Sequence, residues 1–191
     1  KLLGSEVCDD GDVSDSSKCK GDCTGPVSGW TCSGGSSTTA SVCAEVCGDN
    51  VRTISEGCDD NNVNPNDGCS GTCLVETGWS CSNAVMPSTC TPICGDGKVM
   101  PGEACDDGDQ SNLDKCNGLC TGSVSGWTCT GGTPTTASSC ITTCGDGVKA
   151  ASEGCDDGSV VDGDGCSSTC VVETGFTCAG SPSICAPACG D

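Results

Sequence analysis

The spacing of 24 cysteines is the feature that most constrains this chain of 191 residues. Four near copies of one pattern follow each other, and the second and third cysteines of each are eleven residues apart, as at Cys155 and Cys166. The fourth cysteine follows four residues later, as at Cys170. A fixed period of roughly 20–50 residues is typical of an array of small supersecondary units. The sequence therefore predicts a tandem array and not one large domain.

The cysteine pattern divides the chain into four repeats and the beginning of a fifth. Repeat 1 lacks the first cysteine and spans 1–46, and the complete repeats span 47–93, 94–143 and 144–188. Residues 189–191 match the beginning of a further repeat, and with one glycine inserted they would continue into residues 1–8. We therefore expect a longer array, or copies that meet end to end.

A longer period pairs the repeats. Repeats 1 and 3 (A type) place Lys18 or Lys115 before the third cysteine, whereas repeats 2 and 4 (B type) place Gly68 or Gly165 there. The B repeats also share Val-Glu-Thr-Gly followed by an aromatic residue. An A–B pair has about a hundred residues, which is a typical domain size. Two such pairs make up the chain.

Composition excludes an ordinary hydrophobic core. Cysteines make up a large share of the hydrophobic residues, and the aromatic residues are Trp30, Trp79, Trp127 and Phe176. Units this small and this poor in apolar side chains depend on disulfides. Each aromatic residue is expected to pack on a disulfide rather than to bind a ligand.

The same composition predicts the fold class. Gly, Ser, Thr, Asp and Asn are spread throughout, and helical periodicity is absent. We therefore expect small disulfide-rich repeats with short β-hairpins and turns and almost no helix, in an elongated tandem array. The expected hairpins pair residues 73–77 with 78–81 and residues 170–174 with 175–178.

Disulfide pairing is the expected use of the cysteines. Structural zinc is the alternative, but the chain has no His and no Cys-x2-Cys, and six cysteines per repeat suit pairing. Because disulfides persist in oxidising compartments, they predict an extracellular or cell-surface location.

Six cysteines allow fifteen connectivities. The interval between the fifth and sixth cysteines varies from repeat to repeat, whereas the intervals among the first four cysteines are constant. We therefore expect the fifth and sixth to close their own loop, in the pairs Cys32–Cys43, Cys81–Cys90, Cys129–Cys140 and Cys178–Cys185. Cys189 and one cysteine of repeat 1 are then left without a partner.

One longer pattern carries a family resemblance. Cys-Gly-Asp-Gly…Glu-x-Cys-Asp-Asp-Gly…Asp-Gly-Cys-Ser-x-x-Cys-x-x-Glu-x-Gly-Trp-x-Cys…Cys runs through 47–90 and 144–185, with departures at 94–140 and 8–43. This pattern resembles the Myxococcus-type cysteine-rich disulfide repeats and the related DUF4215 repeats over essentially the whole chain. The resemblance implies part of a large secreted or surface protein without an assigned catalytic activity.

Charge narrows the classes of partner and reaction. Seven basic residues stand against 27 acidic ones, for a net charge of −20, and there is no His. Nucleic acid is not expected as a partner because its phosphates would be repelled. No segment approaches the apolar length of a membrane helix. Without His and Tyr a hydrolytic triad has no candidate base, so the chain is not expected to be an enzyme.

Calcium is the expected cofactor. Hard cations prefer several oxygen ligands on a flexible loop that contains glycine. The loop between the second and third cysteines, called the A loop or B loop after its repeat type, supplies them. We expect one ion in each B loop: at Asp59, Asp60 and Asp67 in repeat 2, and at Asp156, Asp157 and Asp164 in repeat 4. In the A loops Lys18 or Lys115 is expected to supply the positive charge instead. The alternative is that the aspartates accept turn hydrogen bonds from backbone amides.

Runs of Ser and Thr between the fifth and sixth cysteines of the A repeats are candidate glycosylation sites. The chain has no Asn-x-Ser/Thr sequon, so any glycan would be O-linked. A solvated loop is the other interpretation. The candidate residues are Ser36, Ser37, Thr38, Thr39, Thr133, Thr135 and Thr136.

These observations favour an extracellular structural protein that forms a rod or filament from tandem disulfide-stapled repeats. Its expected partners are copies of itself or adjoining repeats, end to end, with glycans on the surface. The alternative is a calcium-dependent adhesion or ligand-binding ectodomain of a cell-surface protein. A filament requires head-to-tail contacts, whereas an adhesin requires a recognition surface that does not repeat.

Overall fold

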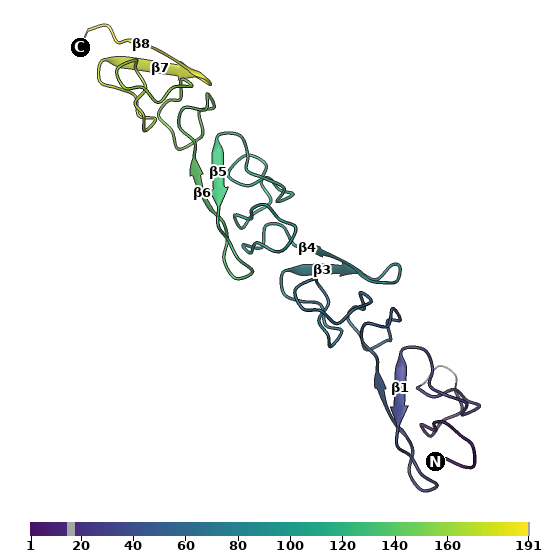
Figure 1. Ribbon diagram of the computed structural model, residues 1–191. Coiled ribbons are helices and arrows are strands. Elements are labelled where there is room, and N and C mark those ends of the chain that lie inside the picture. The colour runs from purple at the N-terminus through teal and green to yellow at the C-terminus, as the bar shows by residue number, and fades with distance from the viewer. Residues whose placement is uncertain (15–17, 191) are drawn as a thin grey trace. The chain divides into compact units, whose positions relative to one another are not determined.

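A computed structural model describes residues 1–14 and 18–190 of the chain; residues 15–17 and 191 lie outside this part. Contacts divide the chain into two compact units, of which the first runs from Lys1 to Pro92 and the second begins at Ile93. Each unit contains one A repeat followed by one B repeat (Figure 1). The described residues form short strands, bridges and turns and no helix, as predicted. They include no helix that could cross a membrane.

Each repeat contributes one antiparallel hairpin of two strands. In unit 1 the strands are β1 (Trp30–Ser33), β2 (Val42–Glu45), β3 (Trp79–Ser82) and β4 (Thr89–Pro92). In unit 2 they are β5 (Trp127–Thr130), β6 (Ser139–Thr142), β7 (Phe176–Gly180) and β8 (Ser183–Pro187).

The hairpins differ from those expected from the sequence. Residues 78–81 were expected to pair with the segment just before them, but β3 pairs with β4, so that Trp79 lies opposite Pro92. The segment from 73 to 77 forms only a single bridge, between Val75 and Cys69. The counterpart at 170–174 likewise forms one bridge, from Val172 to Cys166. The physical reason is the disulfide between the fifth and sixth cysteines, which holds two more distant segments together.

Alternating burial explains why these short segments are strands. Side chains in a strand point alternately to opposite faces. In β5, Trp127 and Cys129 are partly buried, whereas Thr128 and Thr130 are exposed. Cys129 lies directly opposite Cys140 in the register, and the two Cα atoms are 4.0 Å apart. The cross-strand disulfide thus fixes the register of each hairpin.

Eleven disulfides in three classes connect the described residues. The fifth and sixth cysteines pair across each hairpin, in the four pairs that the spacing indicates: Cys32–Cys43, Cys81–Cys90, Cys129–Cys140 and Cys178–Cys185. The second and third pair in Cys8–Cys19, Cys58–Cys69, Cys105–Cys116 and Cys155–Cys166. The first and fourth pair in Cys47–Cys73, Cys94–Cys120 and Cys144–Cys170. This number of disulfides indicates an oxidising environment.

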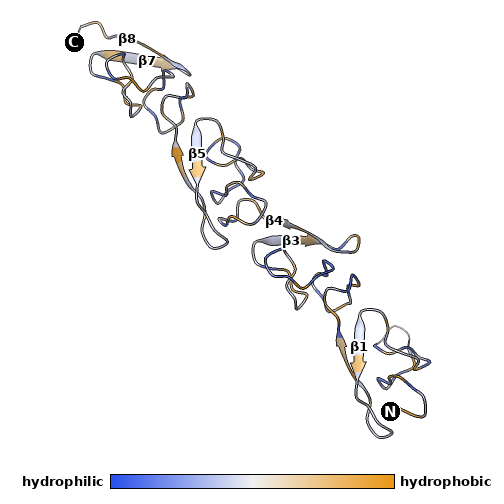
Figure 2. Cartoon of the chain, viewed as in Figure 1, coloured by the Kyte–Doolittle hydropathy of each residue, from blue (hydrophilic) through white to orange (hydrophobic). Residues whose placement is uncertain are grey.

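Disulfide sulfur takes the place of an apolar core. In repeat 3 the buried cluster consists of Cys105, Cys116 and Cys120, with Cys94 and Cys129 packed against it. Among the described residues, apolar residues elsewhere occur in short stretches along the chain (Figure 2). Many large aliphatic side chains are exposed as a result. The fold therefore depends on cross-links and polar contacts more than on apolar burial.

Candidate functional site

A buried aspartate lies at the centre of each complete repeat and accepts hydrogen bonds from three or four backbone amides. In repeat 3, Asp106 is fully buried. Its Oδ2 accepts from the amides of Gly95 (2.7 Å) and Asp96 (3.2 Å). Its Oδ1 accepts from the amides of Gly97 (3.0 Å) and Gly108 (2.8 Å). These donors offset the cost of removing a carboxylate from water.

The B repeats contain the same arrangement. Asp59 accepts from the amides of Gly48, Asp49, Asn50 and Asn61 at 2.9–3.2 Å. Asp156 accepts from the amides of Gly145, Gly147 and Gly158 at 2.8–2.9 Å. Burial alone would raise the pKa of Asp156, but these amides outweigh burial and hold that pKa below its ordinary value. The Cys-Gly-Asp segment that opens each complete repeat thus supplies backbone amides to the central aspartate.

A serine two residues before the sixth cysteine connects the hairpin to this aspartate. The amide of Asp106 donates to Oγ of Ser138 (3.1 Å), and the amide of Ser138 donates to the carbonyl oxygen of Asp106 (2.7 Å). The other repeats form the same pair of bonds, through Ser41, Ser88 and Ser183. Each hairpin is therefore held both by its own disulfide and by the central aspartate.

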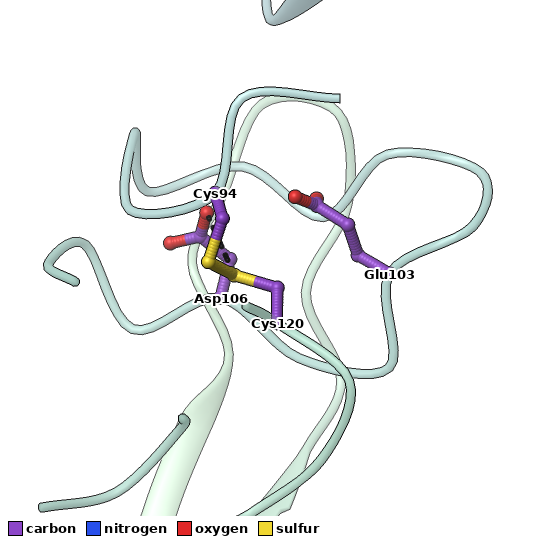
Figure 3. Close-up of side chains that lie close together, drawn as sticks. All are labelled: Cys94, Glu103, Asp106 and Cys120. Carbon is purple, nitrogen blue, oxygen red and sulfur yellow. Dashed lines mark hydrogen bonds between the residues drawn. A yellow bond between two sulfur atoms is a disulfide. The ribbon is translucent and has the colours of Figure 1, made fainter. Parts of the chain in front are cut away.

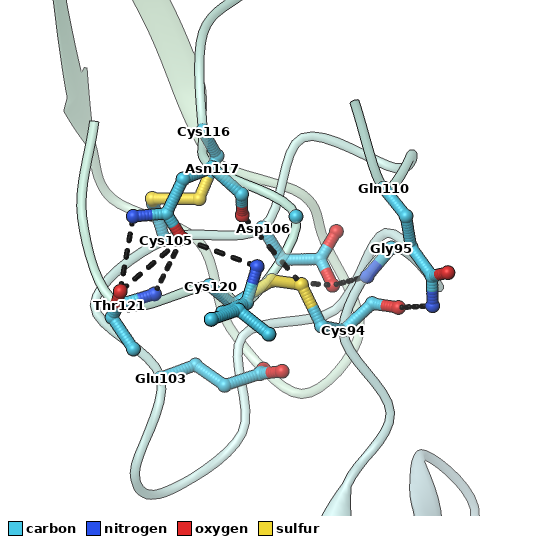
Figure 4. Close-up of a disulfide and its surroundings, with 12 residues drawn as sticks. Cys94, Gly95, Glu103, Cys105, Asp106, Gln110, Cys116, Asn117, Cys120 and Thr121 are labelled. Atoms are coloured by element: carbon cyan, nitrogen blue, oxygen red, sulfur yellow. Dashed lines mark hydrogen bonds between the residues drawn. A yellow bond between two sulfur atoms is a disulfide. The ribbon is translucent and has the colours of Figure 1, made fainter. Parts of the chain in front are cut away.

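A glutamate lies on the other side of the disulfide between the first and fourth cysteines. Figure 3 shows Glu103 and Asp106 flanking the Cys94–Cys120 disulfide, and Figure 4 shows the surroundings of that disulfide. One carboxylate oxygen each of Glu103 and Asp106 and both sulfurs lie within 4.8 Å of one another. The sulfurs are bonded to each other and the aspartate oxygens accept amides, so this cluster is poorly suited to hold a metal ion.

The structure does not bring together the three aspartates predicted to bind calcium in each B loop. Asp59 and Asp156 point inward to their amides, so the alternative of backbone hydrogen bonds describes these two residues. Asp60 is instead directed toward Asp67. Burial raises the pKa of Asp60, and the charge of Asp67 adds to this effect. Adjacent residues of an extended segment point in opposite directions, which is why each Asp-Asp pair is divided.

In repeat 4 the predicted residues are likewise divided. Asp157 accepts from the amide of Ser159 (3.0 Å), and Asp164 is exposed. The cluster of three aspartate oxygens within 4.8 Å of one another among the described residues lies in repeat 3, at Asp107, Asp109 and Asp114. Repeat 3 is an A repeat, where no calcium was expected. Repeat 1 has Asp15 instead of an aspartate two residues before its third cysteine, and Asp15 lies outside the described residues.

The A-type lysines do not play the role predicted for them. The ammonium group of Lys18 lies over the ring of Trp30, 5.3 Å from its centroid. Among the ion pairs within 4.0 Å that the described residues form, none includes Lys115. Lys115 adopts a positive φ of 41° instead. Neither lysine therefore forms an ion pair within 4.0 Å with a described carboxylate of its loop.

A second glutamate, which was not predicted as a site residue from the sequence, distinguishes the B repeats. Glu173 accepts from the amides of Gly163 (2.7 Å) and Gly165 (2.8 Å), and both of its oxygens are used. Glu76 binds the amides of Asn66 (2.9 Å) and Gly68 (3.0 Å) in the same way. The sequence contained a signal for this glutamate, because Val-Glu-Thr-Gly occurs only in the repeats where glycine precedes the third cysteine.

The candidate glycosylation residues occupy exposed turns at the tips of the A hairpins. Oγ of Ser36 accepts from the amides of Thr38 and Thr39 (both 3.1 Å). Thr133 occupies the same position in repeat 3, and its hydroxyl lies 2.8 Å from that of Thr136. Ser36 and Thr133 thus hold their turns together. The others, Ser37, Thr38, Thr39, Thr135 and Thr136, present exposed side chains at the tips.

Two cysteines carry no disulfide, namely Cys23 and Cys189. Cys23 holds the place of a fourth cysteine and Cys189 that of a first. Burial raises the pKa of the Cys23 thiol, and the charges of Glu6 and Asp9 add to this effect. In the three complete repeats, cysteines in these two places pair with each other. The two free thiols therefore occupy the two positions, first and fourth, that form a disulfide in the complete repeats.

Together these features define a class of small disulfide-stapled hairpin repeats built around an amide-bound aspartate. Comparison with known families matches the description "Domain of unknown function (DUF4215)" at residues 28–74, 76–121 and 127–171, more than half of the chain. The chain belongs to this DUF4215 family. The DUF4215 part of the resemblance is confirmed, whereas the Myxococcus-type name receives no support. No curated protein and no solved structure matches the chain.

Proposed function

We propose that this chain is an extracellular structural protein whose tandem repeats form a rod or filament. The observation that supports this proposal most directly is the connection between repeats. One residue, Val46, separates β2 from the next first cysteine, and its amide donates to the carbonyl oxygen of Gly29 (3.0 Å). In unit 2, Thr143 separates β6 from Cys144, and its amide bonds Gly126 (2.9 Å). Connections this short leave little freedom between neighbouring repeats.

Side chains reinforce the connection in unit 1. Glu45 at the end of β2 accepts hydrogen bonds from the hydroxyl groups of Thr53 and Ser55 in repeat 2. These bonds lower the pKa of Glu45, Ser55 contributing more than Thr53. Repeat 1 and repeat 2 are thus joined by a short covalent connection and by side-chain hydrogen bonds. A structural role requires such rigid coupling.

The two free cysteines support end-to-end partners. If Cys189 bonds to a fourth cysteine like Cys23, the first–fourth disulfide class continues from one set of repeats into the next. The partner is then an adjoining repeat or another copy. The exposed hydroxyl groups at the A hairpin tips would carry O-glycans on the outside of such an assembly. Catalysis forms no part of this proposal, since the central carboxylates are occupied by backbone amides.

Electron microscopy of the native material tests the proposal. Filaments that shorten on mild reduction are the expected result. The matched variants are Cys189→Ser, which should abolish the covalent link between sets of repeats on non-reducing gels, and Ser168→Ala, an exposed change that should leave it intact. Discrete particles of uniform size, unaffected by Cys189→Ser, would overturn the proposal.

A calcium-dependent ectodomain is the second candidate, and the outer carboxylates favour it. Oδ1 of Asp60, Asp67 and Asp114 are each sealed from solvent without a hydrogen-bond partner. Hard cations prefer such oxygens. We therefore propose that calcium, if bound, lies at Asp107, Asp109 and Asp114 in repeat 3 and between Asp60 and Asp67 in repeat 2.

Calorimetric titration of the whole chain with calcium tests this second candidate. Asp114→Asn should remove the repeat 3 site, whereas Asp22→Asn, an exposed aspartate outside the cluster, should not. Lys115→Gly should leave the site in place, because Lys115 takes no part in an ion pair with these carboxylates. Equal binding by the wild type and Asp114→Asn would exclude the assignment.

A further inference from the structure

One glutamate oxygen in each complete repeat is sealed from solvent without a hydrogen-bond donor. Oε2 of Glu103 accepts from the amide of Met100 (2.8 Å), and Oε2 of Glu56 accepts from the amide of Thr53 (2.6 Å). Oε1 of both residues has no partner and no contact with solvent. Glu153 repeats this arrangement. Because it recurs in three repeats, the unpartnered oxygen is a feature of the fold.

The charges that face these glutamates are negative. For Glu103 they come from Asp106 across the Cys94–Cys120 disulfide and from Asp96 (Figure 3). For Glu56 they come from Asp59 and from Glu45 of the preceding hairpin. The basic residue Arg52 lies near Glu56, but its Nη1 donates to the backbone carbonyl of Glu56 (2.9 Å) and not to the carboxylate.

The two carboxyl groups beside each disulfide have opposite surroundings. Asp106 is an acceptor for four amides, which favour its ionised form. Glu103 receives one amide, on one oxygen only. An ionised oxygen that is buried without a donor costs far more than a neutral hydroxyl in the same place. When two carboxyl groups lie this close, their environments decide which of them keeps the proton.

We propose that Glu56 and Glu103 remain protonated in the folded repeat at pH values where exposed glutamates are ionised. Each of these repeats then contains a neutral glutamic acid and an ionised aspartate on either side of one disulfide. The pair acts as a proton-linked element of the fold: loss of the glutamate proton places two negative charges around the buried sulfurs.

The pKa directions agree with this assignment. Burial raises the pKa of Glu56 above its ordinary value of 4.5; the amide of Thr53 opposes this effect, and Glu45 and Asp59 add to it. Burial likewise raises the pKa of Glu103, with Asp106 and Asp96 adding to it. A pKa raised on folding means that the folded state binds the proton more tightly. The contribution to stability is therefore full below pH 4.5 and is lost as the pH rises through the folded pKa.

Carbon-13 NMR of the whole oxidised chain, labelled at glutamate Cδ, tests the proposal directly. Signals assigned through Glu56→Gln and Glu103→Gln should keep the chemical shift of a neutral acid to a higher pH than the ordinary value of 4.5. Titration of both groups at or below that value would overturn the proposal. This measurement on the wild type does not depend on whether a variant folds.

A matched pair of variants adds a second readout. Gln resembles a protonated glutamate, so Glu103→Gln should keep the thermal midpoint of the wild type at low pH and remove part of its decline with rising pH. Glu173 needs both of its oxygens as acceptors, so Glu173→Gln should lower the midpoint at neutral pH, where exposed glutamates are ionised. If Glu103→Gln lowered the midpoint at neutral pH as much as Glu173→Gln, the glutamate would be ionised and the proposal wrong.

Discussion

Gly68 lies directly against Cys90, and a Cβ atom at this glycine would come within 2.2 Å of the Cβ of Cys90. It would also lie 3.1 Å from the ring of Trp79, which is 9 % exposed. The same relationship occurs in repeat 4, where a Cβ at Gly165 would lie 2.5 Å from Cβ of Cys185. In the B repeats the aromatic residue and the hairpin disulfide therefore pack onto a glycine, which agrees with the structural role expected for the aromatic residue.

Gly68→Ala is predicted to destabilise unit 1. The residue has a φ of 118°, where L side chains are strained, and the new methyl group would clash with a disulfide that cannot move away. We expect a loss of roughly 3 kcal/mol from the combined strain and overpacking. Thermal unfolding monitored by circular dichroism would measure it. Gly25→Ala, where a Cβ meets nothing within 4 Å, is the control and should change stability little.

Asp106→Asn is predicted to be among the most damaging single changes. The variant keeps the shape of the side chain but turns one acceptor oxygen into an NH2 group that faces backbone amides. Hydrogen bonds to a charged group contribute about 1.5–3 kcal/mol each, so a loss above about 3 kcal/mol is expected. The yield of correctly paired disulfides after oxidative refolding would measure it. Asp162→Asn keeps an Oδ1 that can accept the one exposed bond from the amide of Ser168, so this variant should refold like the wild type.

Acid is predicted to weaken the repeats through Asp156. Its pKa is lowered in the folded state, so on acidification the unfolded state takes up a proton before the folded state does. The contribution is present above the ordinary value of 3.8 and is lost as the pH falls below it. A fall in thermal midpoint between about pH 5 and about pH 2 should be smaller in Asp156→Asn. An identical slope in the two proteins would contradict the prediction.

Native material is predicted to carry O-glycans at the tips of the A hairpins. Its intact mass should exceed the 18.6 kDa of the polypeptide by whole hexose-type increments. Peptide mapping should place them on Thr38, Thr39, Thr135 or Thr136 and not on Ser138, whose Oγ binds the amide of Asp106. Unmodified peptides across both tips would leave only the solvated-loop interpretation.

The sequence was sufficient for features that depend on spacing along the chain. Repetition, the absence of helix in the described part and the hairpin pairs such as Cys129–Cys140 all follow from cysteine intervals and composition. The pairing of Cys94 with Cys120 could not be predicted, because six cysteines allow fifteen arrangements and these intervals are constant.

The acidic loops were harder to interpret for a different reason. Asp59 and Asp60 are adjacent and chemically identical, yet one accepts backbone amides in the interior and the other faces Asp67. Nothing in the side chains distinguishes them, since the donors are backbone groups that every residue possesses. The role of Lys18 was hard to predict for a similar reason, because its ammonium group lies over the ring of Trp30.

The bonds between the central aspartates and the hairpin serines bear on how the chain oxidises during synthesis. Asp106 and Ser138 are 32 residues apart, and the longest disulfides span 26. Every such contact can close while the next repeat is still being translated, since domains fold from the N-terminus as they emerge. The choice of partners then stays among a few thiols at a time, and the chain never has to sort 24 at once.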